Sequence, residues 1–172
     1  MAANREVAGS TDSKASSLSN RLWRYGPLIV WMVLIFAGST DVLSASHSGL
    51  IVRPALLWLF PHITEPQIAV VHFLVRKLSH FSEYAILAVF AARAFQGSAK
   101  RGLRQKWFLA SLVLIVIYAF SDEIHQSFEP SRTASIYDSL IDIAGGVTAL
   151  LITLCWQRRR RLGASPTVRE GS

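Results

Sequence analysis

The chain has 172 residues, of which 51% are hydrophobic and 17% charged, and it carries a formal net charge of +7. Soluble globular domains usually have about a quarter of their residues charged, and here the charged residues are also segregated from long apolar runs. This composition excludes a small soluble domain and predicts an integral membrane protein. The lone Cys155 supports no disulfide.

The first predicted element is a transmembrane helix over about residues 25–43, "YGPLIVWMVLIFAGSTDVL". The polar segment 1–22 before it is rich in Ser and charge, which predicts a disordered cytoplasmic tail. A cleaved signal peptide is the alternative interpretation of the apolar run. The long leader and the absence of an A-x-A site after the run favour a retained span.

A short apolar stretch over 50–60 follows, interrupted by Arg53-Pro54. It is too short to cross a bilayer, so we expect an interfacial or re-entrant helix. The second span is predicted over about 78–95. Pro66 suits the first turn of a helix, so this helix could begin there and project above the bilayer.

The third span is predicted over 107–122, and it reaches membrane length only if it continues through Gln126. The fourth is predicted over 136–156, followed by a basic cytoplasmic tail over 158–172. The expected fold class is therefore all-α: a four-helix transmembrane bundle over 23–157, with a short interfacial helix between spans one and two.

Basic residues are divided unevenly by these four spans. Fourteen of the 18 Lys and Arg residues fall on the side that holds both termini, which predicts that both termini are cytoplasmic. The four on the other side are Arg53, Arg76, Lys77 and Arg132. The basic clusters would meet anionic lipid headgroups. They indicate no nucleic-acid partner, because no aromatic-basic module accompanies them.

Polar residues gather at the outer ends of three spans. At helical spacing they fall on single faces of these spans: Lys77, His80, Glu83 and Tyr84; then Tyr118, Asp122, His125 and Gln126; then Asp138, Asp142 and Gly145. Ionisable groups in a membrane are costly and are usually paired and functional. We therefore expect the three faces to meet around a shared, outward-facing polar pocket.

Two kinds of candidate residue line this expected pocket. The candidates for general acid–base chemistry are Lys77, His80, Asp122, Glu123 and His125. The candidates for binding are Glu83, Tyr84, Gln126, Arg132, Asp138 and Asp142. No HExxH or similar ligand spacing indicates a metal, no Ser or Cys stands in an evident activated setting, and the sequence identifies no cofactor.

Structural interpretations compete with these roles. Asp138 follows Ser135 by three residues, which is the spacing of a helix capping box. Lys77 could form an ion pair with Asp122 or Glu123 that only fixes helix registry. Glycines such as Gly145 are typical of helix–helix packing.

The segments "VRKLSHFSEYAILAVF" and "SDEIHQSFEPSRTASIYDSLIDIAGG" resemble the VanZ-like family of bacterial membrane proteins. The matching positions are Arg76, Lys77, His80, Phe81 and Tyr84; Asp122, Glu123 and Gln126; Pro130 and Arg132; and Asp138, Asp142 and Gly145. Ser131 stands where the family commonly has Gly. The resemblance implies a multi-pass protein of the bacterial inner membrane, and for the family's namesake it implies reduced susceptibility to the glycopeptide teicoplanin, without a defined reaction.

Three classes of function remain open from the sequence. The first is an envelope protein whose pocket binds or modifies a lipid-linked or glycan headgroup, with a lipid-linked envelope precursor or a glycopeptide as partner. The second is a small proton-coupled transporter or channel, since His and carboxylate chains form proton relays. The third is a non-catalytic membrane assembly protein.

Overall fold

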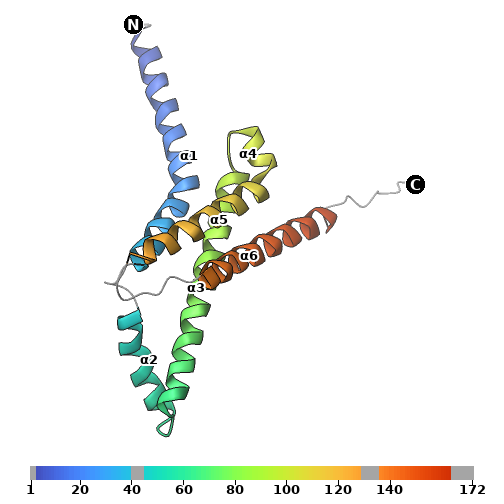
Figure 1. Ribbon diagram of the computed structural model, residues 1–172. Coiled ribbons are helices and arrows are strands. Elements are labelled where there is room, and N and C mark those ends of the chain that lie inside the picture. Colours follow the sequence, from blue (N-terminus) through green and yellow to red (C-terminus); the bar gives the residue numbers. More distant parts are fainter. Residues whose placement is uncertain (1–2, 40–44, 129–135, 164–172) are drawn as a thin grey trace, which may run out of the picture.

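The computed structural model describes residues 3–39, 45–128 and 136–163. These residues form six helices and no strand, which confirms the all-α class (Figure 1). The helices are α1 (Ala3–Gly38), α2 (Ala45–Leu59), α3 (Glu65–Gln96), α4 (Arg101–Gln105), α5 (Trp107–Gln126) and α6 (Ile136–Gly163).

The long helix α3 is the centre of the fold and contacts α1, α5 and α6. Its pairing with α6 is parallel, because Lys77 meets Asp138 at one end and Gln96 meets Gln157 at the other. Its pairing with α1 is antiparallel: the Tyr25 hydroxyl lies 3.1 Å from Ser98 Oγ, just beyond the end of α3, and Trp31 lies against Phe90.

Helix α5 runs alongside α1 in the same direction. The Tyr118 hydroxyl donates to the Met32 carbonyl at 2.5 Å, and Gln126 Nε2 donates to Ser39 Oγ at 3.3 Å. Helices α1, α3, α5 and α6 therefore alternate in direction along the chain.

Small residues allow α3 and α6 to pack closely. A Cβ atom added at Gly145 would lie 2.2 Å from the Phe81 carbonyl oxygen, and one at Gly146 would lie 2.8 Å from a methyl group of Ile115. Ala88 and Ala91 of α3 are fully buried in the same core. The predicted packing role of these glycines is confirmed.

Among the described residues, two helices, α5 and α6, are long and apolar enough to cross a membrane. Helix α5 extends through Gln126 as its span requires. The stretch of α3 over 78–95 contains His80, Glu83 and Arg93, which lower its hydropathy. Spans through α1 and α3, and with them the four-span bundle, stay predictions.

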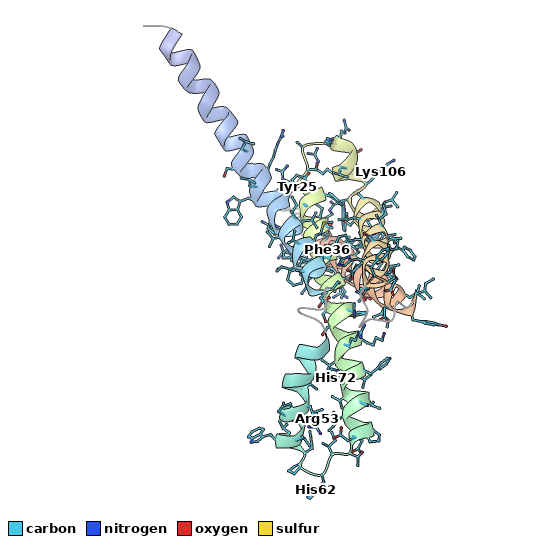
Figure 2. All side chains as sticks on the ribbon, turned by 60° about the vertical axis from the view of Figure 1, so that its left-hand side comes forward. Tyr25, Phe36, Arg53, His62, His72 and Lys106 are labelled. Carbon is cyan, nitrogen blue, oxygen red and sulfur yellow. The ribbon has the colours of Figure 1, made fainter. Side chains whose placement is uncertain are left out.

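Helix α2 runs back along the first half of α3, so the two form a helical hairpin that points away from the bundle (Figure 1). Arg53 and Glu65 form a 2.6 Å ion pair, and Thr64 and Gln67 form a capping box at the start of α3. The predicted start of this helix near Pro66 is confirmed. The short helix expected here is present as α2, which forms one arm of the hairpin, with His62 near the hairpin tip (Figure 2). Its interfacial position stays a prediction.

Helix α1 begins at Ala3 and α6 continues to Gly163, so helix extends into both segments expected to be tails. The last nine residues lie outside the described part of the chain. The division into a 1–22 tail, a 23–157 domain and a 158–172 tail stays a prediction.

Candidate functional site

Polar side chains from α3, α5 and α6 are buried together at one end of the bundle. We call the following residues the polar cluster: Lys77, His80, Tyr84, Asp122, Gln126, Asp138 and Asp142. All but Lys77 are at most 7% exposed. The structure thus brings the predicted polar faces together, with these side chains buried among the described residues; an outward-facing pocket at this place stays a prediction.

The first contact in the cluster joins Lys77 to Asp138. Lys77 Nζ donates to Asp138 Oδ1, and the two side chains are 19% and 5% exposed. We expected Lys77 to form an ion pair with Asp122 or Glu123. That prediction is wrong, because the ion pair is with Asp138. The parallel pairing of α3 and α6 sets Lys77 level with Asp138, whereas Asp122 lies on α5. Ser135 is outside the described residues, so the capping-box alternative for Asp138 is not described.

The second contact joins His80 to Asp142, one helical turn further into the bundle. His80 Nδ1 lies 3.3 Å from Asp142 Oδ1, and both side chains are buried. Neither of these two atoms has a hydrogen-bond partner within the described part of the chain. The two side chains are therefore close enough for an ion pair, but these two atoms form no hydrogen bond with a described residue.

The α5 side of the cluster is held by Gln126. Its Nε2 donates to Asp122 Oδ2 at 3.0 Å and to Ser39 Oγ at 3.3 Å. Asp122 Oδ1 and the Tyr84 hydroxyl are buried, and neither has a hydrogen-bond partner among the described residues.

The other predicted site residues lie at the margin. Glu83, Glu123 and His125 are half-buried. The His125 ring stacks on Phe36 of α1 with ring centroids 4.1 Å apart, and its Nε2 is buried with no described partner. Arg132 lies outside the described residues.

Two serines belong beside the polar cluster although the sequence did not single them out. Ser139 is fully buried on α6, and its hydroxyl has no partner among the residues described. It lies three residues before Asp142, on the same helix face, and this spacing could have identified it. Ser39 accepts the hydrogen bond from Gln126. It follows α1 directly and carries no comparable sequence signal.

Several polar atoms at this end of the bundle thus lack hydrogen-bond partners in the described chain. They are His80 Nδ1, Tyr84 Oη, Asp122 Oδ1, His125 Nε2, Ser139 Oγ and Asp142 Oδ1. Leaving a buried donor or acceptor unsatisfied costs about 1–3 kcal/mol per group. In native structures nearly all buried polar groups have a hydrogen-bond partner. No three His, Cys, Asp or Glu side chains of the described residues are grouped to hold a metal ion.

Two apolar helices of membrane length among the described residues, with ionisable side chains buried between helices, indicate a helical membrane protein. The VanZ/LLP1 family profile matches residues 25–157, and the chain belongs to this family. The resemblance predicted from the two segments is confirmed. No curated protein and no solved structure matches the chain.

Proposed function

We propose that this protein is a four-pass inner-membrane protein whose polar cluster faces outward and binds the polar headgroup of a lipid-linked envelope molecule. Changes in glycopeptide susceptibility would follow from that binding. The observation that carries the proposal is the set of buried polar atoms in and beside the polar cluster that have no hydrogen-bond partner among the described residues.

The alternating directions of α1, α3, α5 and α6 support four crossings with both termini on the same side, and the basic residues favour the cytoplasmic side. Nineteen residues separate Lys77 from Gln96, and the same number separates Asp138 from Gln157. That is about 28 Å of α-helix, close to the roughly 30 Å hydrocarbon thickness of a bilayer. The polar ends of the α3–α6 pair would therefore lie at the two membrane surfaces.

The chemistry of the cluster suits a ligand that carries both hydroxyl groups and an anionic group. The carboxylates of Asp122 and Asp142 accept hydrogen bonds, while Lys77 donates them. Headgroups of lipid-linked sugars combine these features. They also lie at the depth where the cluster would meet the bilayer surface.

A headgroup would first meet the polar cluster at Lys77. Its side chain is the most exposed of the cluster. A phosphate could replace Asp138 as its partner, which would free Asp138 to accept from sugar hydroxyls. His80, Asp122, Glu123 and His125 would then be available for acid–base chemistry on the bound headgroup.

A binding assay tests the proposal directly. The purified protein in detergent should bind a lipid-linked disaccharide phosphate more tightly than phosphatidylglycerol, which has the phosphate but not the sugar. Ser139→Ala and Asp142→Asn remove candidate partners with little change of volume. They should weaken binding, while Ser82→Ala on an exposed face of α3 should not.

Two outcomes would contradict headgroup binding. Proton flux through proteoliposomes that disappears in Asp142→Asn would instead indicate the proton-coupled transporter. Unchanged binding together with a uniform loss of thermal stability in the cluster variants would indicate a purely structural network.

A further inference from the structure

We infer that the opposite end of the bundle holds a second site, which binds one anionic phospholipid through its phosphate. The site is a cavity of about 600 Å³ between the ends of α3 and α6 and the start of α5. We call it the basic cavity. Its lining residues are Gln96, Arg104, Trp107, Trp156, Gln157, Arg160 and Arg161.

The floor of the basic cavity is built by the ends of two packed helices. Gln157 Nε2 donates to Gln96 Oε1 at 2.8 Å, which ties the end of α6 to the end of α3. This tie lies about 28 Å along the helices from the Lys77–Asp138 contact. The basic cavity is therefore distinct from the polar cluster.

Three arginines line the cavity, and none of its described lining residues is acidic. Arg104, Arg160 and Arg161 also take part in no ion pair with any residue that the structure describes. Three guanidinium groups around one cavity repel one another. A bound anion relieves that repulsion, and arginine is well suited to bidentate contact with phosphate.

Two of these arginines are already oriented. The Arg160 guanidinium stacks over the Trp156 ring at 3.7 Å from its centroid, a cation–π contact that restricts the guanidinium plane. Arg104 Nη1 lies 3.5 Å from the Ser98 carbonyl oxygen, a long contact that directs the side chain across the loop. Partial ordering of this kind lowers the entropic cost of binding.

The surroundings favour a lipid over a free phosphate. Trp107 and Trp156 are amphipathic side chains of the kind that gather at membrane–water interfaces. One turn before Trp156, Ile152 is 65% exposed, and Leu151 beside it is 47% exposed. A phospholipid whose phosphate lies in the basic cavity would place its acyl chains along this apolar surface of α6.

Lipid titration by native mass spectrometry of the full chain in detergent tests this inference. The wild-type protein should bind one phosphatidylglycerol well before it binds phosphatidylcholine of the same chain length. The triple variant Arg104→Gln, Arg160→Gln, Arg161→Gln should bind phosphatidylglycerol at least about tenfold more weakly.

A matched control loses the same charge outside the cavity lining. The triple variant Arg101→Gln, Arg158→Gln, Arg159→Gln should weaken binding by no more than about twofold, because long-range attraction is small beside direct contact. Equal weakening in both triple variants, or equal affinity of the wild type for both lipids, would overturn the inference.

Two further measurements keep the result unambiguous. Soluble glycerol phosphate should not displace the lipid at micromolar concentration, and if it does, the cavity is a site for a soluble phosphate. Should the lining triple variant misfold, the single variant Arg160→Gln replaces it. A several-fold loss is expected there, and unchanged binding would refute the site.

Discussion

At Gly145, α6 packs directly against the backbone of α3, and Gly145→Ala tests this packing sharply. The added Cβ would lie 2.2 Å from the Phe81 carbonyl oxygen, 2.9 Å from its carbon and 3.0 Å from its Cα. All three atoms are backbone, so no side-chain rotation can relieve the clash. The helices must separate by about 1.2 Å to reach an ordinary contact of 3.4 Å.

Overpacking a tight interface costs about 1–3 kcal/mol, and the upper value applies here because backbone must move. Phe81 adjoins His80, so separation of the helices also disturbs the contact with Asp142. We expect Gly145→Ala to destabilise the protein by about 3 kcal/mol, a fall in Tm on the order of 10 °C. Thermal unfolding in detergent, followed by size-exclusion recovery, measures it.

Two other glycines serve as controls. Gly26 in α1 has nothing within 4 Å of an added Cβ, so Gly26→Ala should leave Tm unchanged or raise it slightly through helix propensity. For Gly146→Ala the three nearest atoms all belong to the Ile115 side chain rather than to backbone, so its Tm should fall between the other two. A Tm for Gly145→Ala equal to that of Gly26→Ala would refute the close packing of α3 on α6.

Three further predictions follow from the site and the topology. Asp142→Ala should lower stability by about 1–3 kcal/mol in detergent unfolding. This loss of stability is smaller than the cost of leaving a permanently charged buried cation without its partner, because His80 can become neutral. An unchanged Tm would mean that the Asp142 carboxylate is solvated. If the protein raises the tolerance of a teicoplanin-sensitive host, His125→Gln should abolish that tolerance at equal protein level, and retained tolerance would remove this histidine from the mechanism. Reporter fusions after Gly97 and at Ser48 should report the cytoplasm and the exterior respectively, and an exterior signal at Gly97 would overturn both the topology and the placement of the polar cluster.

Much of the helical arrangement could be predicted because it depends on local signals. The apolar runs gave the positions of α5 and α6, and Pro66 indicated the early start of α3. Helical spacing alone placed His80 and Tyr84 on one face and Asp138 and Asp142 on another, and all four are buried in the polar cluster.

The pairing inside the cluster could not be predicted in the same way. Which carboxylate meets Lys77 depends on the parallel register between α3 and α6, and no local pattern encodes a register between helices 61 residues apart in the chain. The α2–α3 hairpin escaped prediction for a related reason. The hydropathy pattern shows that α2 is too short to span a membrane. It does not show that α2 packs along α3, because this packing and the Arg53–Glu65 ion pair that accompanies it are contacts between two elements.

In helix α3, the residues of the polar cluster lower the hydropathy by which a membrane span is recognised from sequence. His80 and Glu83 lower the hydropathy of the same stretch that contacts α1, α5 and α6. Polar groups are tolerable there because neighbouring helices surround them, and His80 is only 7% exposed. Placing such groups on a peripheral helix would expose them to lipid, at about 2.5–3.5 kcal/mol for each charged residue. Buried polar groups are therefore best shielded on the central helix, and there they also lower the hydropathy by which a span is recognised.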